Sequence, residues 1–245
     1  SIAQKTIYYT QPEQLFNRGK EMFLGGNWEG AEQLLKKFVA GSDDTYLSEE
    51  AAYMMAVSSF YRGSDNSGYI MEAFLDAHPE TIHRDQVNFL IGSYHFDKKE
   101  WQAAGERFNQ ADLDYLTLSE QEDYSFRSAY TQLQLGNKEE ATRLFGLLSQ
   151  NSNKYRDAAA FYLGYIEYSS GNYAEALRRF ERLQNHPEYS EEVAFYTAQA
   201  TFFDGKIEEA VSLSEAFVQR YPASEHLTEA YRVLGNSYYR LGQAS

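Results

Sequence analysis

The stretch "GYIEYSSGNYAEALRRF", from Gly164 to Phe180, contains two helical runs joined by a Gly-Asn turn. Gly164 lies inside the first run, although glycine in a helix interior costs about 1 kcal/mol relative to alanine. A second small residue, Ala176, follows on the second run. Because small side chains let two backbones approach each other, this stretch predicts a pair of helices that pack closely at these positions.

This pattern returns about every 36 residues, a period typical of stacked helical repeats. The small residue recurs at Gly19, Ala56, Gly92, Ala129, Gly164, Ala198 and Gly235. A turn glycine follows most of these, at Gly26, Gly63, Gly136, Gly171, Gly205 and Gly242. A bulky residue also recurs on the second run, at Leu35, Phe108, Phe145 and Phe180. Several registers that stay in step along the whole chain indicate one repeated structural unit.

Each repeat predicts two helices, because the first run ends at a glycine and several of the second runs end near a proline. The first helices are predicted near 12–25, 48–62, 84–97, 119–134, 155–169, 189–203 and 225–241. The second helices are predicted near 28–40, 66–77, 100–115, 138–150, 173–184 and 207–220.

The pattern resembles the tetratricopeptide repeat (TPR) family. The best match lies in residues 155–188, at Leu163, Gly164, Gly171, Tyr173, Ala176, Phe180 and Pro187. The resemblance implies an all-α fold, a right-handed superhelical solenoid of antiparallel helix pairs with about six and a half repeats. An N-terminal extension, 1–11, would precede repeats near 12–47, 48–83, 84–118, 119–154, 155–188, 189–224 and, in part, 225–245. Because the last repeat has one helix, we expect that the parent protein can continue past Ser245.

The family's first helices line a concave face, which the resemblance implies is the site for a protein or peptide. Large side chains recur there three residues before or four residues after the small residue, and the residue directly after the small one lies between them on the same face. In the best-matching repeats the candidate peptide-binding residues are Phe126, Tyr130, Phe161, Tyr165, Tyr168, Phe195, Gln199 and Phe202. Aromatic rings supply much of the contact area in such sites. The alternative is that these aromatic residues form the core between successive first helices.

A second candidate site lies on the last predicted helix. Arg232, Asn236 and Arg240 are spaced by four residues and therefore share one helix face. Two guanidinium groups and an amide can bind a carboxylate, such as the C-terminus of a peptide. The alternative is that these side chains pair with Glu229 or with chain that follows.

The composition excludes several classes of function. Acidic residues exceed basic ones by 36 to 22, which gives a formal net charge of −14 and disfavours nucleic acid as a partner. The chain has no cysteine, and its five histidines are scattered without a zinc-binding spacing. No apolar run approaches the roughly 20 residues that cross a bilayer. We therefore expect no enzyme activity, no cofactor, no metal and no membrane span.

The sequence thus predicts a non-catalytic scaffold that binds a protein or peptide through its concave face. The alternative is a structural assembly subunit of a bacterial envelope complex that binds through its outer surface. Ser1 and Ala3 suit the small-residue end of a removed secretory signal. We therefore expect a periplasmic or envelope-associated protein in a bacterium, with the cytoplasm as the alternative.

Overall fold

The computed structural model describes the backbone of residues 2–244 and the side chains of residues 12–242. Within this range the regular elements are thirteen α-helices and two 3₁₀-helices, with no strand, which confirms the all-α prediction. The chain divides into two compact units, Ser1–Arg127 and Ser128–Ser245. Helix α7 (Leu118–Gln134) contributes residues to both units.

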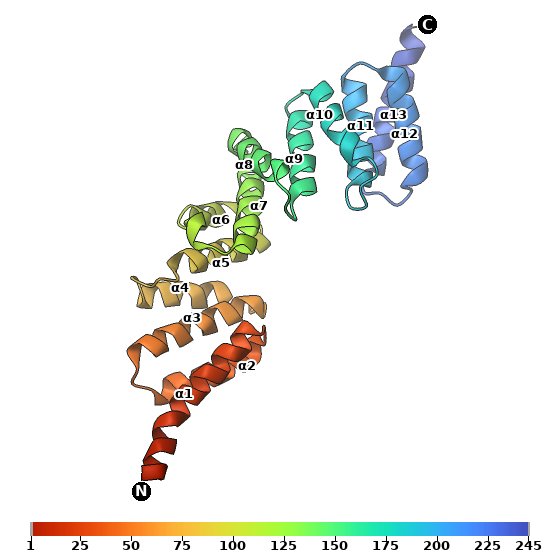
Figure 1. Ribbon diagram of the computed structural model, residues 1–245. Coiled ribbons are helices and arrows are strands. Elements are labelled where there is room, and N and C mark those ends of the chain that lie inside the picture. Colours follow the sequence, from red (N-terminus) through yellow and green to blue (C-terminus); the bar gives the residue numbers. More distant parts are fainter. Residues whose placement is uncertain (1, 245) are drawn as a thin grey trace. The chain divides into compact units, whose positions relative to one another are not determined.

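The first unit consists of helices that pack against one another in chain order. Its helices are α1 (Ile2–Leu24), α2 (Trp28–Gly41), α3 (Thr45–Tyr61), α4 (Ser67–Ala77), α5 (Arg84–Asp97) and α6 (Trp101–Phe108), followed by the 3₁₀-helix η1 (Leu113–Tyr115). Figure 1 shows α1 to α6 lying one against the next. Helix α3 also contacts α1 and α5, so the first helices of successive pairs touch directly.

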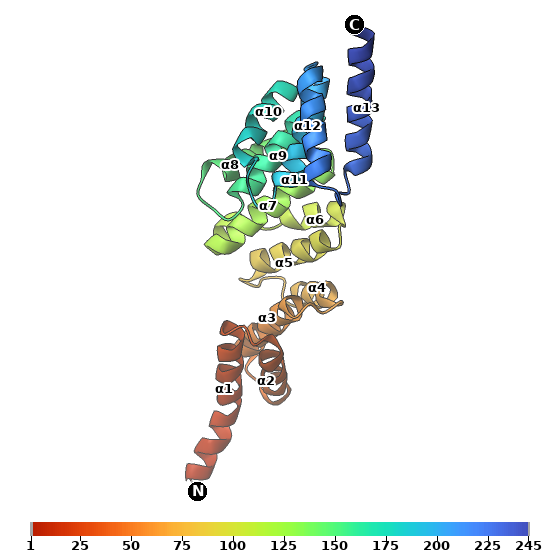
Figure 2. The same cartoon turned by 90° about the vertical axis from the view of Figure 1, so that its right-hand side faces the viewer.

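The second unit continues the same arrangement. Its helices after α7 are α8 (Lys138–Gln150), α9 (Arg156–Ser169), α10 (Tyr173–Phe180), α11 (Ser190–Phe203), α12 (Ile207–Arg220) and α13 (Leu227–Ala244), with the 3₁₀-helix η2 (Glu181–Leu183) after α10. Helix α11 contacts both α9 and α13, as well as α10 and α12. Figure 2 presents the same helices after a quarter turn.

Three helices differ in length from the sequence prediction. Helix α1 begins at Ile2 and includes Pro12, so residues expected to form an extension are helical. Helix α6 ends at Phe108 instead of near residue 115. The side chain of Asp112 accepts a hydrogen bond from the backbone N–H of Asp114 at 3.0 Å, and this local bond competes with the helical one. Helix α10 likewise gives way to η2 after Phe180.

The core is built around one phenylalanine from the second helix of most pairs. Phe38, Phe108, Phe145, Phe180 and Phe217 are all buried almost completely. A Cβ atom added at Gly164 would lie 2.5 Å from Cε1 of Phe180, and one added at Gly92 would lie 2.6 Å from Phe108. In these two pairs the glycine of the first helix therefore provides the surface on which the phenylalanine ring of the second helix packs.

The turns between paired helices need a left-handed residue. Gly26, Gly63, Gly136, Gly171 and Gly205 all have φ between 73° and 86°. Their N–H groups close the preceding helix, as in the bond from Gly171 to the Tyr168 carbonyl at 3.0 Å. At the corresponding place after α5 stands Lys99, which adopts φ of 60° without being a glycine.

We expect Lys99→Gly to stabilise the protein. A residue with a side chain is strained in the left-handed region by about 1–2 kcal/mol, whereas glycine adopts it freely. Part of this gain is lost to the greater freedom of glycine in the unfolded chain, so the net gain is about 1 kcal/mol. A thermal melt should show a midpoint a few degrees higher.

The matched control is Lys98→Gly. Lys98 directly precedes Lys99 but has a φ of −87°, in the right-handed region, where a side chain causes no strain. This control should lower the midpoint. A melt in which both variants behave alike would show that the φ of Lys99 carries no strain.

Candidate functional site

Three half-buried tyrosines lie together where α9 meets α11. The ring of Tyr196, on α11, lies 5.4 Å from that of Tyr165 and 5.1 Å from that of Tyr168, both on α9. The hydroxyl of Tyr168 donates a hydrogen bond to Oε1 of Gln199, which is itself buried. We call Tyr165, Tyr168 and Tyr196 the tyrosine cluster. It presents partly exposed aromatic rings that neighbouring helices hold in place.

Burial also changes the acidity of this cluster. It raises the pKa of the Tyr168 hydroxyl to about 12, with a smaller contribution from neighbouring tyrosines and Glu229. Burial likewise raises the pKa of Tyr196 to about 12, with smaller contributions from Tyr165 and Glu192. The two hydroxyls are therefore neutral hydrogen-bonding groups at physiological pH, in surroundings that carry negative charge.

We expect these pKa values to destabilise the protein at high pH. The folded-state pKa of Tyr196 lies above the ordinary value of about 10, so folding favours its neutral form. The resulting stability is complete below pH 10 and is lost as the pH rises toward 12. Tyr196→Phe removes this ionisation, and its melting temperature should fall less than that of the parent between pH 9 and 11.

Melting temperatures at several pH values test this expectation, with Tyr231→Phe at an exposed position as the matched control. If Tyr196→Phe and the parent lose the same number of degrees over this interval, the ionisation of Tyr196 does not limit stability.

The three phenylalanines predicted for this face in the second unit belong to the core instead. Phe161 stacks on Tyr189 at 5.2 Å, and Phe195 stacks on His226 at 4.1 Å. Phe202 lies beneath the guanidinium of Arg240, 4.5 Å from it. Phe161, Phe195 and Phe202 are all buried. This agrees with the alternative interpretation, in which the aromatic residues form the core between successive first helices.

The remaining predicted aromatic residues lie on α7. Tyr130 is half-buried and makes an edge-to-face contact with Tyr162 at 5.2 Å. Phe126 is also half-buried but belongs to the first unit, so it is not part of the tyrosine cluster. Gln199, predicted to contact a ligand, is buried and serves to anchor Tyr168. Of the predicted residues, Tyr165 and Tyr168 therefore form the shared aromatic surface.

Tyr196 completes this surface and was not among the predicted residues. It lies two residues before Ala198, whereas the prediction considered the positions three before, one after and four after the small residue. A signal was available in the sequence. Tyr162 stands two residues before Gly164, so the same aromatic position recurs in consecutive repeats.

The candidate carboxylate-binding residues lie on α13. Arg232, Asn236 and Arg240 all have exposed side chains. However, Nε of Arg232 donates to the Glu229 carboxylate at 3.0 Å. This bond holds the pKa of Glu229 below its usual value. A ligand carboxylate would have to displace Glu229, so carboxylate binding at this position stays a prediction.

The described residues contain no group of three histidine or acidic side chains arranged to hold a metal ion. Among the helices in residues 2–244, none is both long enough and apolar enough to cross a membrane.

Comparison with known proteins relates the chain to helical repeat proteins. Residues 153–245 match a family model described as "YfiO: Outer membrane lipoprotein". No curated protein matches the chain. The structure of PilF from Pseudomonas aeruginosa is similar with a TM-score of 0.60 at 16% identity, covering 89% of this chain and 95% of that one.

Two further solved structures show the same likeness. A tetratricopeptide repeat protein from Parabacteroides merdae has a TM-score of 0.58 at 20% identity, covering 95% of this chain and 87% of that one. The apo form of RapI has a TM-score of 0.62 at 11% identity, covering 95% of this chain and 72% of that one. At such identities the likeness establishes the fold. Together with the helix pairs, the turn glycines and the glycine–phenylalanine packing, it shows that this chain has the fold of tetratricopeptide-repeat proteins.

Proposed function

We propose that the chain is a non-catalytic scaffold that binds a protein or peptide on the first-helix face of its second unit. The observation that carries this proposal is the tyrosine cluster on α9 and α11. Tyrosine combines a large apolar ring with a hydrogen-bonding hydroxyl and has few rotatable bonds, so it gives contact area at low entropic cost.

The surroundings of the cluster favour a basic or neutral partner. The carboxylates of Glu192 and Glu229 act electrostatically on Tyr196 and Tyr168 respectively. The whole chain carries a formal net charge of −14. A segment with lysine or arginine next to an apolar side chain would therefore match both the rings and the negative charge.

A peptide-binding assay tests this proposal. An array of basic and neutral peptides selects a ligand, and titration calorimetry then compares the parent with Tyr165→Ala. Removal of one central aromatic ring should weaken binding by about tenfold or more, because truncated aromatic anchors commonly dominate such interfaces. The melting temperature should stay close to that of the parent, since Tyr165 is only half-buried.

The matched control is Tyr69→Ala on α4, in the first unit, where the side chain is 77% exposed. This control should bind as the parent does. If Tyr165→Ala also binds with the affinity of the parent, the tyrosine cluster is not the binding surface.

A second candidate function is a structural subunit of a bacterial envelope complex. It is favoured by the match of residues 153–245 to the YfiO outer membrane lipoprotein model. On this proposal the protein lies in the bacterial envelope and binds its neighbours through exposed side chains of its second helices. Leu147 on α8 is such a position, because 53% of its side chain is exposed.

Photo-crosslinking in living cells distinguishes the two functions. A crosslinking amino acid replaces Tyr165 in one variant and Leu147 in another. Adducts that form only at residue 165 support the peptide-binding face, whereas adducts only at residue 147 support assembly through the outer surface.

A further inference from the structure

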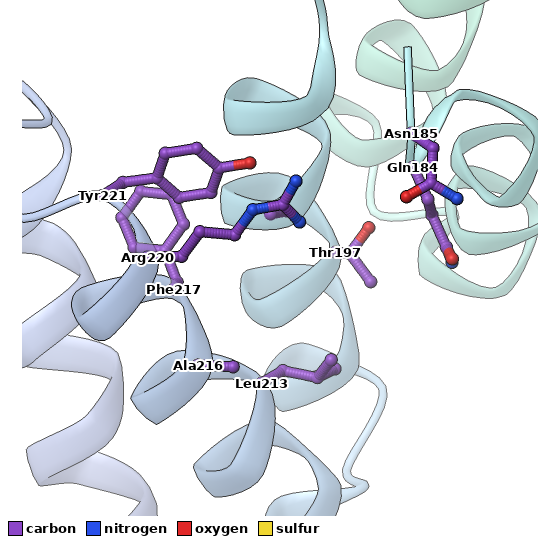
Figure 3. Close-up of a pocket in the computed structure, with 9 residues that line it drawn as sticks. Gln184, Asn185, Thr197, Leu213, Ala216, Phe217, Arg220 and Tyr221 are labelled. Atoms are coloured by element: carbon purple, nitrogen blue, oxygen red, sulfur yellow. The ribbon is translucent and has the colours of Figure 1, made fainter. Parts of the chain in front are cut away.

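A small hollow lies in the second unit between α11, α12 and the chain that follows η2. Figure 3 shows its lining residues, and its volume is about 220 Å³. Ala194 on α11 and Leu213, Ala216 and Phe217 on α12 provide its apolar part. This volume is enough for one aliphatic side chain of an occupant.

This hollow lies on a different face of α11 from Gln199, the residue that holds Tyr168 of the tyrosine cluster in place. Ala194 and Thr197 line the hollow, whereas Phe195 and Gln199 face the neighbouring first helices. With about 3.6 residues per turn, these two pairs point to different sides of one helix. The hollow is therefore a separate surface from the one proposed above for peptide binding.

Polar groups meet at one side of the hollow. In Figure 3 the guanidinium of Arg220 and the hydroxyl of Tyr221 extend from the end of α12 toward α11, where Thr197 lies. The hydroxyl oxygens of Thr197 and Tyr221 are buried and have no hydrogen-bond partner within the described part of the chain. Buried hydroxyl groups without a partner are costly, so an occupant that bonds to them gains affinity.

Arg220 is the only charged residue among the described residues that line this hollow. Its guanidinium lies 5.2 Å from the ring of Tyr221 and makes no ion pair with any side chain that the structure describes. No aspartate or glutamate stands among the residues that line the hollow, so no acidic side chain of the lining competes for this guanidinium. Its fork of N–H donors matches a carboxylate.

The corresponding hollow in the preceding helix pair has a different character. There Arg179 and Arg182 stand where α12 has Leu213 and Ala216. Arg179 is engaged by Glu167 at 3.7 Å and by Glu175 at 3.1 Å. Asp157 and Glu181 also line that hollow, whereas no acidic residue lines the one between α11 and α12, which has an apolar floor and a single arginine.

We propose that this hollow binds a segment of a partner protein in which an aliphatic side chain stands next to an aspartate or glutamate. The aliphatic side chain fills the space against Leu213 and Phe217. The carboxylate binds Arg220, and backbone groups of the segment bond to the hydroxyls of Thr197 and Tyr221. Because Arg220 is positively charged, it attracts an acidic segment and repels a basic one.

The experiment uses the full chain, labelled with ¹⁵N, and the blocked peptide acetyl-Gly-Gly-Leu-Glu-Gly-Gly-amide. The amide resonances of Thr197 and Leu213 are followed by NMR as peptide is added up to about 10 mM, since contact with a single side chain gives weak binding. These resonances should shift in a saturable way. The analogue with Gln in place of Glu should bind about tenfold more weakly, because it loses the charge-assisted bond.

Variants of the protein identify the role of Arg220. Arg220→Gln should reduce the affinity for the Glu peptide to that for the Gln peptide, and Arg220→Lys should retain part of the difference. Arg178→Gln is the control, because Arg178 already pairs with Glu175 at 2.7 Å, and it should change nothing. Tyr165→Ala should also leave this binding unchanged, so failure here and failure of the tyrosine cluster are distinguishable.

Three results would overturn the proposal. The first is the absence of saturable shifts at Thr197 and Leu213. The second is equal binding of the Glu and Gln peptides. The third is self-association that depends on Arg220 in sedimentation experiments without peptide, which would assign the hollow to a second copy of this chain.

Discussion

Phe180→Ala should lower the free energy of unfolding of the second unit by about 3–5 kcal/mol. Phe180 is fully buried, with an exposed fraction of 0%, and its ring lies against Gly164 and Phe161. Removing a buried phenylalanine ring loses its burial and leaves a cavity that the surrounding helices fill incompletely. The ring also contacts Tyr196, so the loss extends to the pair α10 and α11.

Two optical probes separate the units in this experiment. Both tryptophans of the chain, Trp28 and Trp101, lie in the first unit, whereas the far-ultraviolet circular dichroism reports helices of both. In denaturant titrations the dichroism transition of Phe180→Ala should move to much lower denaturant. The matched control is Phe203→Ala on α11, where 45% of the side chain is exposed, and it should cost less than about 1 kcal/mol. Coincident dichroism curves for the two variants would show that Phe180 has no special role in packing.

Gly164→Leu should be nearly as damaging, for the opposite reason. The position of its Cβ atom is 2.5 Å from the Phe180 ring before the rest of the side chain is added. Overpacking of this kind costs about 1–3 kcal/mol, and more where backbones must separate. The gain in helix propensity from replacing glycine is about 0.8 kcal/mol and does not offset this cost.

The matched control for this variant is Gly235→Leu. Gly235 stands at the same place in the repeat, inside α13, but no atom lies within 4 Å of its added Cβ. This control should be neutral or slightly stabilising. A chemical melt in which Gly164→Leu is as stable as Gly235→Leu would contradict the packing described here.

A double variant links the two predictions. If the leucine at position 164 clashes with the ring of Phe180, the combination with Phe180→Ala should cost clearly less than the sum of the single variants, because leucine can enter the space left by the ring. Additive costs would show that the two residues do not share one packing site.

The helix pairs follow from the periodic small residues and turn glycines of the sequence. Five turn glycines adopt positive φ, which residues with side chains adopt only under strain. Local backbone chemistry of this kind depends on the residue itself, so the sequence is enough to locate it. Lys99 shows the limit, because its turn forms without glycine and only the structure reveals it.

Which side chain packs against each small residue is decided by the tertiary structure. The sequence placed Gly164 and Phe180 in two separate registers, and the structure shows that the ring of one packs on the backbone of the other. The early end of α6 also depends on contacts that the sequence pattern does not reveal. The side chain of Asp85 accepts a hydrogen bond from the backbone N–H of Asp112 at 2.8 Å, a contact between residues far apart in the chain.

For the candidate site the sequence determined that aromatic side chains recur on the first helices, because helical periodicity places them on nearly one face. Which of them are exposed was decided only by the neighbouring helices. Phe161 and Phe195 are covered by Tyr189 and His226 from the following turns, while Tyr165 and Tyr196 keep part of their rings exposed. Whether a side chain is buried depends on the helices packed around it, so a periodic pattern on one helix cannot predict it.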